Sequence, residues 1–117
     1  MNVELFVYGL LAPGEPAWPL LAPYAIDTND AGVPGTLYDT GRGYPAAVFT
    51  RDSIDAVRGW RCTLVDPPLA ELDEFEGGEY ERITVRCTDG TEALAYQWIA
   101  PLDGFVAVTD GSWATPR

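Results

Sequence analysis

The segment 66–78 reads Asp66-Pro67-Pro68-Leu69-Ala70-Glu71-Leu72-Asp73-Glu74-Phe75-Glu76-Gly77-Gly78, and it interrupts a chain that otherwise has the pattern of strands. Asp66 is a good helix N-cap, and proline is tolerated in the first turn, where its missing N–H is not needed. Gly77 and Gly78 are an equally good stop signal. The segment therefore predicts one short helix of about two to three turns.

Strand-like segments surround this helix. Ten prolines and twelve glycines divide the chain into short pieces joined by turns, which favours a sheet over a helical bundle. Asp89-Gly90 predicts a hairpin with a type I′ turn, and residues 18–21 predict a helical turn. The expected strands cover residues 5–8, 33–38, 46–50, 55–65, 80–88, 92–99 and 105–108. We expect one α+β domain over residues 1–117, a small mixed β-barrel with one main helix and short helical turns.

The composition limits the possible functions. Eighteen acidic residues face seven basic ones, all arginine, and the formal net charge is -11. Such a surface repels phosphate backbones and anionic lipid, so binding of nucleic acid or membranes is disfavoured. The chain has no histidine, which excludes Ser-His and Cys-His nucleophilic sites and removes the ligand that most catalytic zinc sites use. Acid–base chemistry must then fall to a carboxylate, tyrosine, cysteine or the chain terminus.

The cysteines and the apolar segments indicate the compartment. Cys62 and Cys87 lie far apart, without metal-ligand spacing, each in a strand-like segment. We expect two buried, reduced thiols, with a disulfide as the alternative. The first residues lack the pattern of a signal peptide, and no apolar run approaches the roughly 20 residues of a membrane span. These features predict a cytoplasmic protein.

Glu76 is the strongest candidate for acid–base chemistry. At about 100° per residue, Leu69, Leu72 and Phe75 form the expected buried stripe, and Glu76 projects onto its margin. Desolvation, the negative end of the helix dipole and nearby acids should each raise its pKa. A glutamate tuned towards neutrality suits proton transfer. The alternative is a solvated side chain that extends past the last turn.

A second candidate is the loop that follows the first strand. The strand stops at Gly9, and no helix pattern follows directly, so several backbone N–H groups are left without partners. Such groups can form an anion-binding site for a carboxylate. The alternative is that Gly9 serves only the geometry of the turn.

Four blocks of the sequence occur in an order typical of one family. They are Leu5-Phe6-Val7-Tyr8-Gly9-Leu10-Leu11 with Gly14, Gly35-Thr36-Leu37-Tyr38-Asp39 with Gly41 and Gly43-Tyr44-Pro45-Ala46, Leu72-Asp73-Glu74-Phe75-Glu76-Gly77 with Tyr80, Arg82 and Val85, and Gly111-Ser112-Trp113. Together the blocks resemble the gamma-glutamyl cyclotransferase-like proteins, which include the gamma-glutamylamine cyclotransferases. Leu10 stands where the family usually has Ser or Thr, and Ala12 where many relatives carry a basic residue.

The resemblance implies a small barrel with the loop of residues 8–11 beside Glu76, the family's catalytic glutamate. In this family the α-amine of a gamma-glutamyl group attacks its own side-chain carbonyl, which gives 5-oxoproline and a free amine or amino acid. The resemblance further implies a small-molecule gamma-glutamyl substrate and no cofactor or metal. It implies that Glu76 moves the protons and that the substrate-binding residues are Tyr8, Gly9, Leu10, Leu11 and Tyr80, with Tyr44 as a weaker candidate.

Two other functions remain open at this point. The loss of the hydroxyl at Leu10 favours a non-catalytic module that binds a small ligand on the same fold. Alternatively, four tryptophans could form an exposed patch for a protein partner; they are Trp18, Trp60, Trp98 and Trp113. The oligomeric state and the leaving group are not specified by the sequence.

Overall fold

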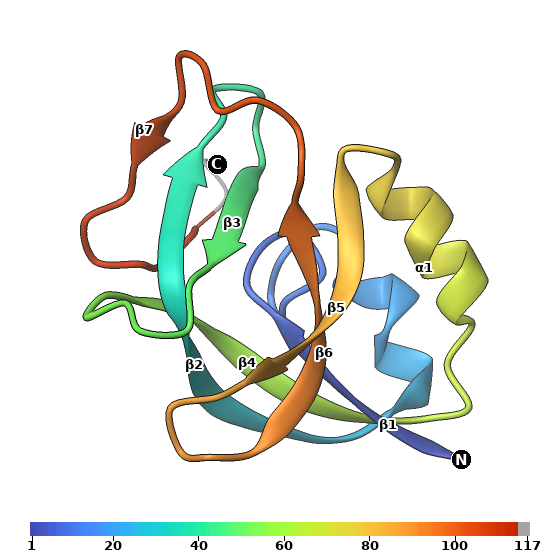
Figure 1. Ribbon diagram of the computed structural model, residues 1–117. Helices are drawn as coiled ribbons and strands as arrows, with labels where there is room; N and C mark the ends of the chain where they lie inside the picture. The colour runs from blue at the N-terminus through green and yellow to red at the C-terminus, as the bar shows by residue number, and fades with distance from the viewer. Residues whose placement is uncertain (115–117) are drawn as a thin grey trace.

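One mixed sheet forms the body of the molecule (Figure 1). The computed structural model describes residues 1–114. Its strands are ordered β3-β2-β4-β1-β6-β5, with β7 paired to β2. The pair β1–β6 is parallel and the others are antiparallel. The elements are β1 (Asn2–Val7), η1 (Trp18–Leu20), η2 (Ala22–Tyr24), β2 (Ala25–Asp39), β3 (Pro45–Phe49), β4 (Ala56–Val65), α1 (Leu69–Glu76), β5 (Tyr80–Arg86), β6 (Glu92–Trp98) and β7 (Val106–Ala107).

The sheet curves into a nearly closed barrel because β2 belongs to both of its halves. The first part of β2 pairs with β4 and the last five residues pair with β3. At the change of partner, Gly35 has φ 153°, and a Cβ there would lie 2.4 Å from the Val48 carbonyl oxygen. Only glycine fits this bend. Figure 1 shows α1 outside the barrel, beside β5. The fold is therefore α+β, as expected.

Side-chain hydrogen bonds close the gap between the two ends of the sheet. The Phe49 amide of β3 donates to Gln97 Oε1 of β6 at 3.0 Å. The Tyr80 hydroxyl of β5 donates to the Pro45 carbonyl of β3 at 2.6 Å. β3 is thus joined to β5 and β6 without a backbone ladder.

β1 is buried on both faces, so its alternate side chains serve two cores. Phe6 and Tyr8, which follows the strand, belong to an inner cluster with residues from β1 to β6 or the loops next to them. Leu5 and Val7 belong to an outer cluster, which α1 and the 3-10 turns cover. The inner cluster is completed by Val33, Leu37, Ala47, Val57, Val85, Cys87, Ala93 and Ala95, and the outer one by Leu11, Ala12, Leu21, Cys62, Leu64, Leu72 and Tyr96.

The expected Asp66 cap is wrong, while the expected stop at Gly77 is confirmed. Pro68 is the N-cap of α1, and no side chain caps the helix. Two prolines separate Asp66 from the first turn, and a residue that precedes proline is disfavoured from the helical region. Asp66 itself takes φ 45° and pairs with the Met1 ammonium group. Gly77 ends the helix with φ 84°.

The hairpin between β5 and β6 is confirmed, but its expected type I′ turn is wrong. Among the described residues outside glycine only Asp66 has positive φ, so Asp89 does not supply the φ that this turn needs. Gly90 alone does, with φ 89°. The Gly90 amide donates to the Cys87 carbonyl and the Cys87 amide to the Thr91 carbonyl. This is a longer loop, in which a turn is followed by one glycine in the left-handed region.

The remaining expectations about secondary structure are confirmed with shifted ends. The helical turn at residue 18 is present, and a second one follows at Ala22–Tyr24. β2 begins eight residues before the expected start, because residues 25–32 are mostly exposed and give no alternating apolar pattern. The last strand is reduced to Val106–Ala107.

Cysteines and tryptophans occupy sheltered positions. Cys62 and Cys87 are free and buried, as expected. Trp98 is buried, and the other three tryptophans are half-buried against the two clusters. The structure therefore gives no support to an exposed tryptophan patch.

No helix within residues 1–114 has the length and apolar character needed to cross a membrane.

Replacing Gly59 by alanine tests the close packing of β4 on β1. A Cβ at Gly59 would lie 2.2 Å from the Val7 carbonyl oxygen, so β1 and β4 would have to separate. We expect Gly59→Ala to lower the free energy of unfolding by about 3 kcal/mol, measured by urea denaturation. Gly78→Ala is the matched control, because nothing lies within 4 Å of its Cβ position. Equal stabilities of the two variants would contradict this packing.

Candidate active site

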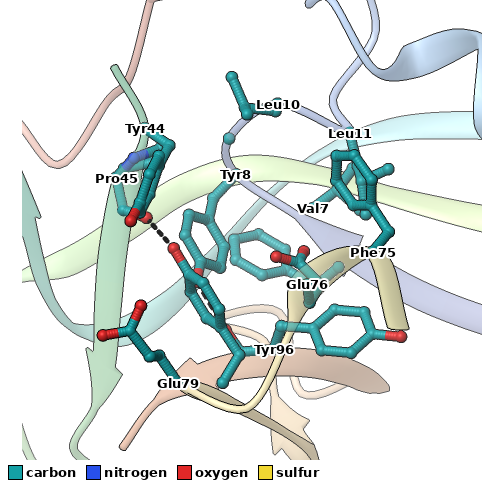
Figure 2. Close-up of a pocket in the computed structure, with 13 residues that line it drawn as sticks. Val7, Tyr8, Leu10, Leu11, Tyr44, Pro45, Phe75, Glu76, Glu79 and Tyr96 are labelled. Carbon is teal, nitrogen blue, oxygen red and sulfur yellow. Dashed lines mark hydrogen bonds between the residues drawn. The ribbon is translucent and has the colours of Figure 1, made fainter. Parts of the chain in front are cut away.

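A cavity of about 210 Å³ lies where the end of β1, the start of β3 and the end of α1 meet (Figure 2). It brings together every residue that the sequence analysis assigned to the site. Its remaining walls come from β5, β6 and the adjoining turns. The lining residues are Phe6, Val7, Tyr8, Gly9, Leu10, Leu11, Tyr44, Pro45, Phe75, Glu76, Glu79, Tyr80 and Tyr96.

Glu76 is the last residue of α1, and its half-buried side chain faces this cavity. Burial raises the pKa of Glu76 from 4.5 to about 7. Of the three effects that we expected to raise the pKa, burial is the one that the structure supports. Within residues 1–114, no group donates a hydrogen bond to the Glu76 carboxylate. Glu76 is thus a carboxylate that can exchange a proton near neutral pH.

The expected buried stripe of α1 is narrower than the pattern indicated. Leu72 is 2% exposed, whereas Leu69 is half-buried and Phe75 is 45% exposed. The helix has only two turns and packs by one edge, so a residue at its end reaches the cavity mouth instead of the core. Glu71 and Glu74 point to solvent, as expected.

Gly9, Leu10 and Leu11, here called the 9–11 loop, line the cavity next to the end of β1. A Cβ at Gly9 would lie 2.8 Å from Pro45 Cγ, so only glycine lets the two segments approach so closely. In the described chain, the amides of the 9–11 loop donate to no other residue. The Leu10 side chain points away from Glu76 in Figure 2, and the cavity is not filled by it.

Tyr8 and Tyr80 line the cavity with their hydroxyls already bonded to backbone. Tyr8 donates to the Tyr96 carbonyl at 2.6 Å, and Tyr80 donates to the Pro45 carbonyl at the same distance. Burial, and then neighbouring groups that include Glu76, raise the pKa of both phenols well above its usual value. Both therefore stay neutral near physiological pH and offer rings to a ligand.

Besides some lining residues, the sequence analysis did not connect Asp73, Arg82 and Tyr96 with the site. Tyr96 donates its hydroxyl to Asp73 Oδ1 at 2.7 Å, and Arg82 Nη1 lies 2.9 Å from the same oxygen. In the sequence, Tyr96 has the pattern of an ordinary core residue in a strand. Asp73 and Arg82 lie on different elements, α1 and β5, and nothing in the sequence indicates that the two residues pair. Only the position of Asp73 three residues before Glu76, on the same side of a helix, could have suggested a connection.

The charges of the site are negative or neutral. Glu76 and Glu79 line the cavity, and no cationic side chain does so among the residues that the structure describes. The same part of the chain holds no group of three or more cysteine, aspartate or glutamate residues placed to bind a metal ion. The arrangement can hold a small ligand by backbone N–H groups and exchange a proton with it through Glu76.

Comparison with known proteins places the chain in a family. The model of the family described as "Gamma-glutamyl cyclotransferase, AIG2-like" matches residues 5–115. A comparison with curated proteins finds no match by sequence. YkqA from Bacillus subtilis is a structural relative with TM-score 0.78 and 29% identity over 97% of this chain. The chain spans only 40% of the length of YkqA.

Two further solved structures show the same fold. A uropathogenic Escherichia coli-specific protein superimposes with TM-score 0.81 and 19% identity, covering 97% of this chain and 93% of its own. An AIG2-like protein from Mus musculus superimposes with TM-score 0.77 and 19% identity, covering 97% and 88%. The family match extends over nearly the whole sequence. The chain therefore belongs to the gamma-glutamyl cyclotransferase, AIG2-like family, and this membership supports a cyclotransferase-type function.

Proposed function

We propose that this protein is an enzyme that cyclises a gamma-glutamyl group to 5-oxoproline and releases an amine or amino acid. One observation carries the proposal: the Glu76 carboxylate has a pKa raised to about 7 and faces the cavity that the residues of the 9–11 loop also line. Family membership supports the reaction type. No cofactor is needed, because both reacting groups lie on the substrate.

Binding of the glutamyl group follows from the unpaired polar groups of the cavity. The amides of the 9–11 loop hold the α-carboxylate, since they have no partner within the described chain. The α-ammonium then lies towards Glu76, whose carboxylate also lacks a donor and attracts a cation. The rings of Tyr8 and Tyr80 pack against the methylene groups. This pose folds the substrate so that its amine approaches its own side-chain carbonyl.

The chemical step needs only proton transfer and bond exchange within the substrate. Ionised Glu76 accepts a proton from the α-ammonium, and the resulting amine attacks the side-chain carbonyl carbon. A new C–N bond closes the five-membered ring, and the original amide C–N bond breaks. Two protons leave the α-nitrogen and two reach the leaving nitrogen, each carried by Glu76 in turn. The products are 5-oxoproline and an ammonium form of the leaving group.

The size of the cavity bears on the substrate. A volume of about 210 Å³ is below the roughly 300–1,000 Å³ of pockets that enclose drug-sized ligands. We infer that the cavity encloses the glutamyl group and that the leaving group extends towards the mouth, past Tyr44 and Glu79.

A non-catalytic ligand-binding module is the second candidate, and Leu10 is the observation that favours it. The residue supplies no hydroxyl to the cavity. Thermal-shift measurements with gamma-glutamyl amines, followed by an assay of amine release from each compound that binds, separate the two functions. Binding without release of 5-oxoproline would support the module and contradict the enzyme.

Replacing Glu76 by glutamine tests the proposed proton carrier. Glutamine keeps the shape of the side chain but cannot accept the α-ammonium proton, so we expect kcat to fall by about 100-fold or more. The measurement is 5-oxoproline formation by mass spectrometry.

The activity of the parent should also fall as the pH drops through about 7, where Glu76 becomes protonated.

Glu74→Gln is the matched control for this experiment. Glu74 lies on the same helix, is exposed, and does not line the cavity. It should retain the activity of the parent. A Glu76→Gln variant that turns over as fast as the parent would contradict the role of Glu76.

The same substitution should stabilise the protein in a pH-dependent way. Because the pKa of Glu76 is higher in the folded chain than its ordinary 4.5, ionising Glu76 costs folding free energy that grows as the pH rises from about 4.5 to about 7. Glu76→Gln should match the stability of the parent near pH 4 and exceed it by up to about 3 kcal/mol at pH 8. Urea denaturation of both proteins measures this; a difference independent of pH would contradict the raised pKa.

A further inference from the structure

α1 is too short to hold its own last turn in place. It has eight residues, no side-chain cap, and one buried residue, Leu72. Isolated helices of this length are unstable in water, so contacts with the sheet must fix it. Glu76 is its last residue and the position most exposed to fraying.

Asp73 supplies a fixed point in this last turn. Arg82 Nη1 of β5 contacts both of its carboxylate oxygens, at 2.9 and 3.0 Å. The Asp73 backbone carbonyl accepts the amide of Gly77, which ends the helix. Asp73 and Glu76 are three residues apart, so they lie on neighbouring sites of one helix surface. Holding the Asp73 side chain therefore limits the rotation of the turn that carries Glu76.

Tyr96 connects the Asp73 side chain to the cavity wall. Its hydroxyl donates to Asp73 Oδ1 at 2.7 Å, and its backbone carbonyl accepts the hydroxyl of Tyr8 at 2.6 Å. Figure 2 shows that the Tyr96 hydroxyl points away from Tyr8 and Tyr44, towards the outside of the cavity. Burial and the contact with Asp73 raise the pKa of Tyr96, so its hydroxyl stays a donor.

We propose that Asp73, held by Arg82 and Tyr96, is a positioning residue that keeps the Glu76 carboxylate inside the cavity. The inference rests on the proposed role of Glu76 in proton transfer. Asp73 does not line the cavity, so it acts through the position of Glu76. Without its two partners the last turn of α1 opens locally, and the Glu76 carboxylate reaches water.

Two variants remove these contacts in different ways. Asp73→Asn weakens the bonds to Arg82 and Tyr96, and Tyr96→Phe removes one bond without changing any charge while keeping the ring in the cavity wall. Titration of the Glu76 side-chain carboxyl by NMR, with ¹³C-labelled glutamate, needs no substrate. We expect a midpoint near 7 in the parent, lowered by about one pH unit or more in each variant as the carboxylate becomes hydrated.

Activity provides the second readout. Both variants should lower kcat by about 10-fold and leave KM within about twofold of the parent, because the substrate contacts remain and only the proton carrier is misplaced. Glu74→Gln controls for the loss of one negative charge on α1, and Glu92→Gln controls for the loss of an exposed ion pair with Arg86 on the same hairpin. Both controls should keep the titration midpoint and the kcat of the parent.

The outcomes distinguish this inference from the proposed function. If Asp73→Asn and Tyr96→Phe keep the midpoint of the parent, the positioning role is wrong, whatever the activity. If Glu74→Gln lowers the midpoint as much as Asp73→Asn, and Tyr96→Phe does not, the effect is one of charge and the proposal also fails. If the parent releases no 5-oxoproline, while the Glu76 titration midpoints of the parent and of both variants are as expected, the proposed function is wrong. The positioning role of Asp73 is then still supported.

Discussion

The close approach of backbones around the end of β1 determines how β1, β3 and β4 meet beside the cavity. Gly59 lets β4 lie directly against the carbonyl of Val7, and Gly9 lets the next turn pass beneath Pro45. These two contacts bring β1, β3 and β4 to one place while leaving the adjacent space unfilled. A Cβ at Gly59 would force β4 away from β1, and a Cβ at Gly9 would force the 9–11 loop away from Pro45. The close approach of Gly9 to Pro45 therefore fixes one part of the cavity wall.

The electrostatics of the site follow from the same arrangement. The cavity has carboxylates but no cationic side chain among its described lining residues, in a protein of formal net charge -11. An anionic group of a ligand must then rely on amide dipoles, which carry no net charge and need no counter-ion. A cationic group is drawn to Glu76 instead. Under the proposed function, a zwitterionic glutamyl group would have one preferred orientation, with its carboxylate at the amides of the 9–11 loop and its ammonium group at Glu76.

The sequence was sufficient to predict features that depend on neighbouring residues. The periodicity of apolar residues and the stop at Gly77 predicted α1 and made Glu76 a candidate. The end of the first strand at Gly9 predicted the loop that lies beside Glu76. Features that depend on partners distant in the chain were missed. The first part of β2 is held by β4 and not by its own pattern, and Asp66 pairs with the chain terminus instead of capping α1. Asp73 and Tyr96 meet only in the folded chain, where the Tyr96 side chain of β6 reaches α1.

The bonds that join β3 to β5 and β6 have a consequence for how the molecule moves. A ladder of backbone hydrogen bonds resists separation at every residue, whereas here the junction depends on Gln97 and Tyr80. Tyr80 and Pro45 also belong to the cavity wall. Breaking the hydrogen bond between Tyr80 and Pro45 would remove one of the two side-chain bonds across the junction and would also free two residues of the cavity wall from each other. Local opening of the sheet at this junction would therefore need fewer hydrogen bonds to break than opening between two strands of a ladder, and it would change the cavity wall at the same time.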